Sequence, residues 1–217
     1  MTENNETLET KETKNNLHFL FPTVLLSSNI ERDIWPEEIE CVEKYKKNIF
    51  RNAGNWGSDS TDVLNDPEFE DIKNFIDLKL KDYFYDIMKA PKHLELYVTQ
   101  SWLNFTEPGE FHHKHIHPNS LVSGVFYLQT EISDKITFFK YFDDTSMIQF
   151  DPTEYAYTNS ASWWLEAEQG NLFIFPSNTY HMVENTVSKK TRVSLAFNTF
   201  IRGEVGQRMN YTKLNLK

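Results

Sequence analysis

The stretch FHHKHIHPNSLVSGVFYL, residues 111–128, joins a histidine cluster to the apolar run that follows it. Four of the chain's seven histidines fall within six residues, directly before the strand-like segment 121–128. Because alternate residues of a strand point to the same face, His113, His115 and His117 can project to one side of an extended segment. Neutral imidazole is a common ligand of transition metals. The stretch therefore predicts β-structure that carries a metal site.

A metal also needs a distant ligand to fix its geometry, and His181 in Tyr180-His181-Met182 offers one. The simpler interpretation of the cluster is a solvated histidine-rich loop that binds metal only adventitiously, since short His-rich tracts are a compositional signal. Both interpretations stay open at this level.

Redox metals such as iron often take two histidines and one carboxylate. The chain has one literal His-x-Glu match, His93-Leu94-Glu95, for which a surface histidine beside a solvated glutamate is the simpler explanation. The pairs His113-x-His115 and His115-x-His117 would instead replace the carboxylate with imidazole. Such an all-histidine face leaves the metal at +2 instead of +1, so a dianionic co-ligand would be held more strongly.

The bulk composition predicts a folded, acidic protein. Apolar residues make up 39% of the 217 positions and aromatic residues 15%, which excludes a disordered chain, and the length suits one domain. The net charge of −10, without a dense Lys/Arg cluster, argues against nucleic-acid partners. Cys41 is the single cysteine, and we find neither a signal peptide nor an apolar stretch of membrane-spanning length. We therefore expect a cytoplasmic protein without membrane partners.

The N-terminal part of the chain predicts a tail, a short strand and two helices. Residues 1–16 hold only two apolar side chains and predict a flexible acidic tail. A single domain is expected over 17–217, beginning with a strand at 17–21. The first helix is expected from Pro36 to about Arg51, because acidic residues open it and basic residues close it. The second is expected from Asp66 to about Met88, after a loop rich in breakers at 52–66. The apolar stripes expected to pack on a sheet are Ile39, Val42, Tyr45 and Ile49 in the first helix, and Phe69, Ile72, Ile76, Leu80, Tyr83, Phe84 and Ile87 in the second.

From residue 93 onward the pattern changes to strands. Aromatic and β-branched residues dominate, turn residues separate the runs, and no long helical pattern intervenes, which disfavours a parallel βαβ sheet. We therefore predict a mainly β (α+β) fold, an antiparallel sandwich or barrel with the two helices against one face. The expected strands are 94–105, 121–129, 135–142, 146–150, 163–167, 171–176, 180–185 and 192–201.

The last expected strand opens with an arginine whose neighbours on the same face are small. One face of the strand takes Val193, Leu195 and Phe197, and the other takes Arg192, Ser194 and Ala196. A lone arginine at the start of a strand is usually a rim charge, but on a small-residue face it indicates a cavity that needs a cation. Arginine holds carboxylates bidentately, and a neighbouring hydroxyl adds a further hydrogen bond.

Several motifs follow one another in a fixed order along roughly residues 17–201. They are His-x-His-Pro-Asn-Ser-x-x-Ser-Gly-Val-x-Tyr-Leu (115–128), Gly-x-Leu-x-x-Phe-Pro-Ser (170–177), His181 and Arg192-x-Ser194, with Leu-Phe-Pro-Thr (20–23) and Gln-Ser-Trp-Leu-Asn (100–104) before them. In this order they resemble the iron(II)/2-oxoglutarate-dependent oxygenases, in particular a group of small bacterial and phage proteins related to prolyl hydroxylases. The resemblance implies a double-stranded β-helix, the jelly-roll core of cupins and oxygenases.

Carried over position by position, the resemblance implies His115 and His181 as iron ligands. His117 stands where most of these oxygenases place Asp or Glu, so the third ligand is His117, a water or an unrecognised carboxylate. Arg192 and Ser194 match the residues that grip the far carboxylate of 2-oxoglutarate. Two further residues, Tyr127 and Asn104, lie on strands that commonly line the co-substrate pocket. No catalytic residue beyond the metal ligands is implied.

The activity implied is that of a 2-oxoglutarate-dependent dioxygenase, an oxidoreductase that uses Fe(2+), 2-oxoglutarate as co-substrate and O2. It would hydroxylate a peptidyl or small-molecule substrate and release succinate and CO2. The alternatives are a three-His cupin-type metal dioxygenase or isomerase without 2-oxoglutarate, and a non-catalytic jelly-roll binding module. Exposed sheet edges allow a homodimer. The aromatic segment 143–164 is expected either to cover the substrate or to pack at a sheet edge.

Overall fold

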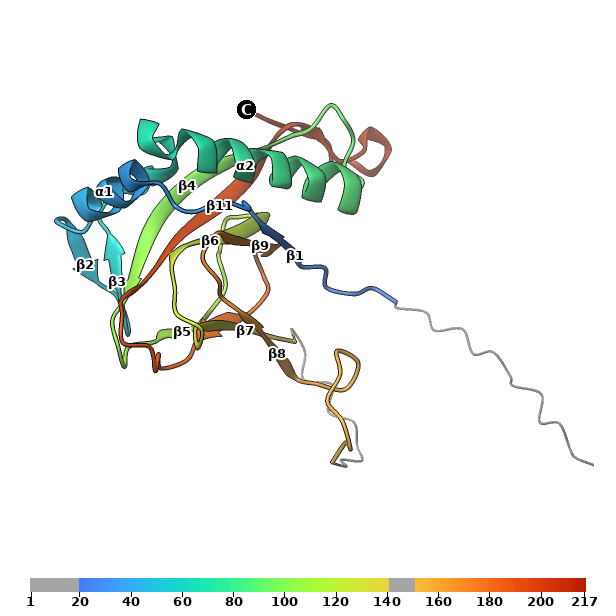
Figure 1. Cartoon of the computed structure of the whole chain (residues 1–217). Coiled ribbons are helices and arrows are strands. Elements are labelled where there is room, and N and C mark those ends of the chain that lie inside the picture. The colour runs from blue at the N-terminus through green and yellow to red at the C-terminus, as the bar shows by residue number, and fades with distance from the viewer. Residues whose placement is uncertain (1–19, 141–150) are drawn as a thin grey trace, which may run out of the picture.

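Two antiparallel sheets face each other in the computed structural model, which describes residues 20–140 and 151–217 (Figure 1). The larger sheet has the order β1-β9-β6-β11-β4-β3-β2, with β12 paired to the end of β11, and the smaller has the order β5-β10-β7-β8. The strands of the larger sheet are β1 (Leu26–Asn29), β2 (Ile49–Arg51), β3 (Trp56–Ser58), β4 (Glu95–Thr106), β6 (Val122–Gln129), β9 (Asn171–Pro176), β11 (Arg192–Val205) and β12 (Leu214–Leu216). Those of the smaller sheet are β5 (His112–His115), β7 (Lys135–Phe139), β8 (Ser162–Glu166) and β10 (His181–Val183). This is the predicted double-stranded β-helix.

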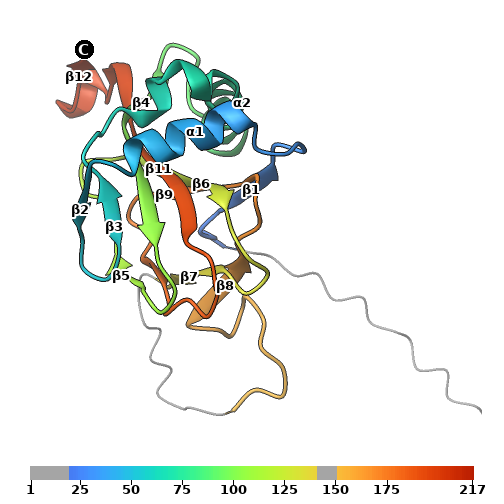
Figure 2. The ribbon, with the colours of Figure 1, turned by 60° about the vertical axis from the view of Figure 1, so that its left-hand side comes forward.

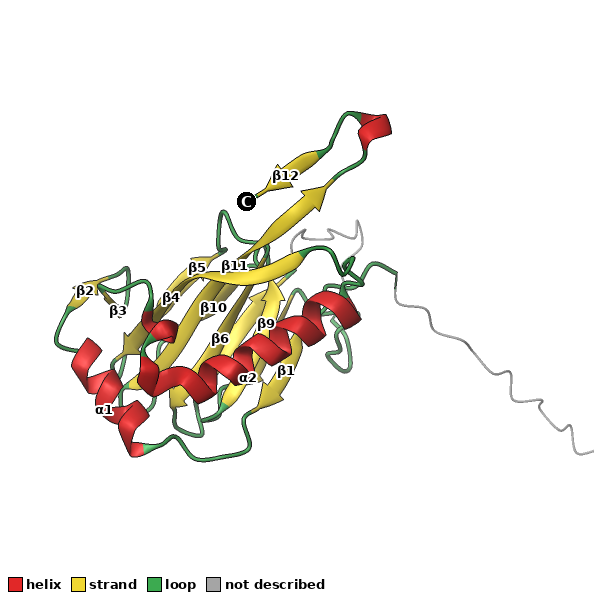
Figure 3. Cartoon of the chain, turned by 90° about the horizontal axis from the view of Figure 1, so that it is seen from above, coloured by secondary structure: helices red, strands yellow, loops and turns green. Residues whose placement is uncertain are grey.

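Two helices, α1 (Pro36–Tyr45) and α2 (Glu70–Lys81), cover the outer face of the larger sheet (Figure 3). Figure 2 shows the smaller sheet on the opposite side of the larger one. Ile72, Ile76 and Leu80 of α2 are buried in one core with inward-facing residues of β4 and β11. Each such aliphatic side chain contributes about 1.5–3 kcal/mol when fully buried. The helices therefore shield one face of the larger sheet from water, and its other face borders the space between the two sheets. No helix in the described residues is long and apolar enough to span a membrane.

The first helix is shorter than its sequence pattern predicts. It ends at Tyr45, and Ile49–Arg51 forms β2, which pairs with β3 in the register Ile49↔Ser58. Ile39, expected in the buried stripe, is 49% exposed. The hairpin adds to β4 through Trp56↔Phe105, so pairing with a strand far along the chain outweighs the local helical spacing.

The second helical region matches its prediction in extent but not in regularity. A 3₁₀ turn (Pro67–Phe69) precedes α2, and a π-helical turn (Asp82–Ile87) follows it. The predicted stripe is buried apart from Ile87, which is 38% exposed at the end of the π turn. The change of helical period there turns the last member of the stripe away from the sheet.

Most of the predicted strands are present with small shifts at their ends. The segments predicted at 94–105, 121–129, 135–142, 163–167, 171–176, 180–185 and 192–201 correspond to β4, β6, β7, β8, β9, β10 and β11. The predicted strand at 146–150 and the tail at 1–16 lie outside the described residues, as does most of the predicted strand at 17–21. Leu20 and Phe21 are exposed and not in a strand, so the first described strand is β1 instead. β1, β2, β3, β5 and β12 were not among the predicted strands.

The alternation predicted for β11 is confirmed. Val193, Leu195 and Phe197 lie in the core under the helices, and Ala196 is buried outside that core. A second, smaller core between the sheets contains Val125, Tyr127, Phe173, Phe175 and Ile136. Gly124 of β6 has to be glycine, because a Cβ there would lie 2.3 Å from the Phe197 ring. The Phe197 ring therefore lies directly over Gly124 on the helix-facing side of the sheet, opposite the face that carries the polar residues of the site.

Candidate metal centre and co-substrate pocket

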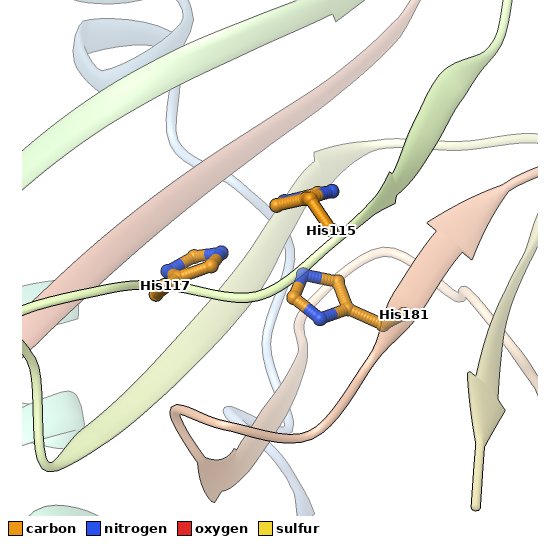
Figure 4. A group of neighbouring side chains, drawn as sticks. All are labelled: His115, His117 and His181. Atoms are coloured by element: carbon orange, nitrogen blue, oxygen red, sulfur yellow. The ribbon is translucent and has the colours of Figure 1, made fainter. Parts of the chain in front are cut away.

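Three imidazoles converge between the sheets (Figure 4). His115 ends β5, His181 begins β10, and the two residues are paired in register. His117 follows two residues after His115, and its ring centroid lies 5.2 Å from that of His115 and 5.0 Å from that of His181. One ring nitrogen of each residue lies within 4.8 Å of the others. The predicted set His115, His117 and His181 is thus brought together by the pairing of β5 with β10.

Each of these rings uses Nδ1 to bond a carbonyl oxygen. His115 Nδ1 lies 2.7 Å from the His113 carbonyl oxygen, and His181 Nδ1 lies 3.0 Å from that of Thr179. His117 Nδ1 lies 2.6 Å from the side-chain oxygen of Asn198. A carbonyl oxygen only accepts hydrogen bonds, so Nδ1 carries the proton in all three rings and Nε2 keeps its lone pair. This donor set fits a divalent transition metal without any change of tautomer.

Burial keeps the three rings neutral. It lowers the pKa of His115 to about 4, against the opposing hydrogen bond to His113, and charge repulsion from His117 lowers it further. Burial also lowers the pKa of His181 to about 3, with repulsion from His115 and His117 adding to the effect. The pKa of His117 is lowered by burial in spite of its bond to Asn198. All three side chains are therefore in the metal-binding form at neutral pH.

Aromatic side chains form the walls of the site. The ring of Phe175 lies 4.8 Å from that of His181, and the ring of Trp102 lies 5.6 Å from that of His117, centroid to centroid. Phe138 of β7 lies 6.0 Å from His181 on the smaller sheet. An apolar shell of this kind limits access of water and strengthens the electrostatic interactions of a bound ion.

A buried arginine stands at the opposite end of the inner face of β11. Arg192 is 3% exposed, its Nη1 donates to the Lys135 carbonyl at 3.2 Å, and its guanidinium carbon lies 5.8 Å from the centre of the Tyr127 ring. Its Nε is buried without a hydrogen-bond partner among residues 20–140 and 151–217. An unsatisfied buried donor costs about 1–3 kcal/mol. The arrangement therefore calls for an anion that the protein itself does not supply.

The other predicted co-substrate residues share this face. Ser194 is the cross-strand partner of Asn104 on β4 and of Tyr127 on β6, so the three side chains cross the sheet in one row. Each of the three is buried. A ligand bound to Arg192 from inside the barrel would contact this row first.

Arg192 also borders a cavity of about 380 Å³. The cavity opens at Ile132 and Val187, which are exposed, and Trp164 on its wall is half exposed. Its charged lining residues besides Arg192 are Asp134, Lys135, Glu166 and Glu184. Arg192 thus lines a cavity whose walls combine charged and apolar side chains.

The other histidine motifs do not join the metal group. His93 and Glu95 are exposed at the start of β4, where His93 Nε2 lies 3.1 Å from the Glu204 carbonyl oxygen, so the surface interpretation of His93-Leu94-Glu95 is confirmed. His113 is exposed, and its ring lies 5.1 Å from that of His115 without adding a nitrogen to the group. Of the two histidine pairs that spacing left open, His115-x-His117 is therefore the one that joins the group.

Two residues of the site were not predicted from the sequence. His112 stacks on His115 with the ring centroids 4.3 Å apart, and its Nε2 lies 3.5 Å from Asn52 Nδ2. Asn198 holds the ring of His117. The signal for Asn198 was present, because continuing the face of Arg192, Ser194 and Ala196 by two residues leads to it. Nothing in the local pattern distinguishes His112 from its neighbours.

The aromatic segment expected near the substrate is partly described. Its residues 143–150 lie outside the described residues. Tyr157 and Trp163 pack together with their ring centroids 4.4 Å apart, while Tyr155 and Tyr157 are largely exposed. Trp164 on β8 lines the cavity beside Arg192. A role for the segment in covering the substrate stays a prediction.

Comparison with known families agrees with this geometry. Residues 100–198 match the model of the family described as "Putative 2OG-Fe(II) oxygenase". The matched segment contains the three histidines, Arg192 and Asn198. No curated protein matches the sequence.

Solved structures of oxygenases share the fold. An oxidoreductase of the 2OG-Fe(II) oxygenase family from Burkholderia pseudomallei is 14% identical, with a TM-score of 0.51 over 82% of this chain and 83% of that one. A prolyl-4-hydroxylase from Pseudomonas putida is 15% identical, with a TM-score of 0.52 over 81% and 92% of the two chains. A prolyl hydroxylase from Trichoplax adhaerens, in complex with a hypoxia inducible factor oxygen degradation domain peptide fragment, is 11% identical, with a TM-score of 0.55 over 81% and 83%. At these identities the likeness shows the jelly-roll fold.

Proposed function

We propose that this chain, whose residues 100–198 belong to the 2OG-Fe(II) oxygenase family, holds iron(II) between His115, His117 and His181 and binds 2-oxoglutarate at Arg192. Membership of that family makes the protein an oxidoreductase that uses iron(II), 2-oxoglutarate and O2, as the sequence resemblance predicted. Bound iron(II) would supply the centre at which O2 is activated, with 2-oxoglutarate converted to succinate and CO2 and one oxygen atom passed to the substrate. The rest of the proposal concerns what the residues of this chain contribute.

The observation that carries the metal assignment is the convergence of one ring nitrogen from each of the three histidines. Each ring is held by an Nδ1–H bond to a carbonyl oxygen, so the lone pairs are set before any ion arrives. His117 takes the position where most of the family has a carboxylate. Among the described residues, no aspartate or glutamate joins this group, which favours His117 over an unrecognised carboxylate as third ligand.

The three histidines of that group are neutral ligands, so they do not reduce the charge of a bound metal ion. Three neutral ligands leave a divalent ion with a net charge of +2, whereas two histidines and a carboxylate leave +1. 2-Oxoglutarate is a dianion, so a site of this charge attracts it more strongly. We infer that the protein relies on co-substrate binding to bring anionic charge to the metal.

Arg192 would bind the far carboxylate of 2-oxoglutarate. Its Nε has no partner, and a carboxylate accepts from the guanidinium in a bidentate arrangement. Ser194 would add a hydroxyl donor, and Tyr127 and Asn104 would complete the wall, since all three lie in one row beside the arginine. Binding of 2-oxoglutarate between the metal site and this anion site gives Arg192 a purpose. A cupin that works without 2-oxoglutarate would have no use for it.

The substrate would be a peptidyl or small-molecule group and not a nucleic acid. The net charge of −10 repels polyanions. The cavity with Trp164 on its wall and Ile132 at its opening offers apolar contacts beside charged ones. The lone, buried Cys41 suits a reducing compartment such as the cytoplasm. Within the described residues, β1 and β2 end the larger sheet and β5 and β8 end the smaller one, and a homodimer would form through one of these edges.

The function is tested by succinate release. Wild-type protein is incubated with iron(II), ascorbate and 2-oxoglutarate, with and without candidate peptides and amino acids, and succinate is quantified. We expect slow release without substrate that is lost in His181→Ala and in Arg192→Ala. Two negative results together would favour the cupin alternative: no succinate from the wild type, with or without any candidate, and no thermal shift on adding 2-oxoglutarate to the metal-loaded protein. Release that both variants retain would contradict the assigned site.

A further inference from the structure

Asn198 is the residue through which His117 is attached to the larger sheet. Its side-chain oxygen accepts a hydrogen bond from His117 Nδ1 at 2.6 Å and a second from Ser123 Oγ at 2.9 Å. Ser123 is also its cross-strand partner on β6. The oxygen is thus held from one side by the sheet and presented to the imidazole on the other.

The serines of the two sequence motifs extend this attachment. Ser123 Oγ lies 2.7 Å from Ser177 Oγ, and Ser177 Oγ donates to Ser120 Oγ at 2.8 Å. Ser177 also accepts, through its carbonyl oxygen, a 2.9 Å bond from the backbone N–H of His117. Ser123 and Ser177 are buried, so the bond between them is made away from water. The motif serines therefore form one network that fixes both the backbone and the ring of His117.

Asn198 reaches the inner face of β11 by simple alternation, two residues beyond Ala196. The pairing of β11 with β4 shifts register directly after it, where Asn198 faces Gln100 and Thr199 faces Val98, so the extra residue is Thr99 of β4. Thr99 Oγ1 donates to the Asn198 carbonyl oxygen at 3.2 Å. The backbone of Asn198 is therefore held by β4 while its side chain bonds His117.

The acceptor at this position is neutral. Ligating histidines often donate their second N–H to a carboxylate, which makes the ligand more basic and adds negative charge near the metal. Here His117 meets an amide, and His115 and His181 meet backbone carbonyls. Among the described residues, the hydrogen-bond partners of these three Nδ1 atoms are therefore all uncharged.

We propose that Asn198 is a positioning residue that fixes His117 with Nε2 as the ligand atom and keeps the triad free of negative charge. The inference rests on the proposed function in taking His117 as a metal ligand and 2-oxoglutarate as the anion that benefits. The amide oxygen orients the ring as a carboxylate would, while the metal keeps its full +2 charge for the dianion. An aspartate at this position would keep the orientation and lose the charge.

The experiment compares Asn198→Ala and Asn198→Asp with a matched control, Asn171→Ala. Asn171 is also half-buried, and its side-chain oxygen also accepts a 2.7 Å hydrogen bond, from Asn29, but it lies away from the histidines. Three quantities are measured on folded protein: the tautomer of His117 by nitrogen-15 NMR without metal, the Ni(II) affinity by titration calorimetry, and the 2-oxoglutarate affinity of the Ni(II)-loaded protein.

We expect the Nδ1–H tautomer in the wild type, in Asn171→Ala and in Asn198→Asp, and a loss of this preference in Asn198→Ala. The Ni(II) affinity should fall about 10- to 100-fold in Asn198→Ala and stay within about twofold in the control. Asn198→Asp should bind Ni(II) at least as tightly as the wild type and bind 2-oxoglutarate about tenfold more weakly.

Unchanged tautomer and Ni(II) affinity in Asn198→Ala, or an equal loss in Asn171→Ala, would overturn the positioning role. Equal 2-oxoglutarate affinity in Asn198→Asp would overturn the charge argument. The tautomer and Ni(II) measurements need no turnover, so the expected pattern in a protein that releases no succinate would sustain the role of Asn198 while the proposed function fails. A wild type that binds no Ni(II) would overturn both.

Discussion

The two ends of the inner face of β11 are prepared for a ligand in different ways. At the Asn198 end, the polar atoms that hold the imidazoles have partners within the protein, and only the Nε2 lone pairs are left. At the Arg192 end, a buried cation keeps one donor without any partner. The metal end is thus organised before binding, whereas the arginine end is completed only by an anion.

The difference matters for how binding would be ordered. A site whose ligands already have the right tautomer and orientation loses little freedom on binding, so its affinity is high for its size. A buried, unsatisfied arginine carries a cost of about 1–3 kcal/mol that a carboxylate removes. Metal would therefore bind with little rearrangement, and the co-substrate carboxylate would give the unsatisfied donor of Arg192 a partner.

Removing a metal ligand should produce the largest effect. His181→Ala leaves two of the three nitrogens, and we expect the Ni(II) affinity to fall by more than about 100-fold, measured by titration calorimetry. His113→Ala serves as control, because its side chain lies outside the metal group although it neighbours His115 in sequence. A comparable loss in His113→Ala would mean that the cluster binds metal as a loose His-rich tract.

Acid should weaken the metal end next. The folded pKa of His181 is about 3, below the value of about 6.5 expected in the unfolded chain, so the unfolded state binds more protons between these values. The stability that this histidine contributes is present above pH 6.5 and is lost as the pH falls toward the folded pKa. We expect the free energy of unfolding of the metal-free protein to fall by up to about 1.4 kcal/mol per pH unit for this residue over that window. Urea unfolding of the wild type and of His181→Phe from pH 7 to pH 4 measures it, and parallel curves would contradict the assignment.

Local patterns of sequence were enough to predict the parts of both ends that lie on regular strands. Alternation along β11 placed Arg192 and Ser194 on the face opposite Val193, and the strand carrying them was predicted from 192–201. Spacing left the pairs His113-x-His115 and His115-x-His117 open, and the resemblance to the oxygenase family implied His115 and His181, with His117 at the position of the usual carboxylate. Strands of this kind are specified by side chains two apart, which a sequence displays directly.

What was missed depends on pairing between distant segments. The hairpin of β2 and β3 was hidden because Ile49 continued a helical spacing, and only its addition to β4 decides the outcome. Asn198 lies on a predicted strand, but its role depends on His117 and on serines from two other segments. Contacts of this range leave no periodic trace in the chain.

Arg192→Ala should weaken 2-oxoglutarate binding at one end and leave Ni(II) binding at the other end unchanged. Loss of the guanidinium removes charge-assisted hydrogen bonds of about 1.5–3 kcal/mol, so we expect the 2-oxoglutarate affinity of the Ni(II)-loaded protein to fall about 10- to 100-fold. The Ni(II) affinity should stay within about twofold, since Arg192 does not contact the triad. In the metal-free protein, Arg192→Met should be neutral or stabilising in urea unfolding, because the unsatisfied donor disappears. A clear destabilisation by Arg192→Met would show that Arg192 is a structural residue.

Ser194→Ala gives the smallest effect and the finest comparison along the same face. Ser194 lies two residues after Arg192 on the same face of β11, buried between its cross-strand partners Asn104 and Tyr127. Its hydroxyl would add one neutral hydrogen bond to a bound carboxylate. Such a bond contributes about 0.5–1.5 kcal/mol, so we expect the 2-oxoglutarate affinity to fall about 2- to 12-fold with the Ni(II) affinity unchanged. Calorimetry on the Ni(II)-loaded protein measures the change, with succinate as a second ligand. Because succinate keeps the carboxylate that faces Arg192 but lacks the keto group, it should lose the same factor. A loss of affinity for 2-oxoglutarate alone would place Ser194 near the keto group instead. The co-substrate would then bind in the opposite orientation, with its keto end toward Arg192.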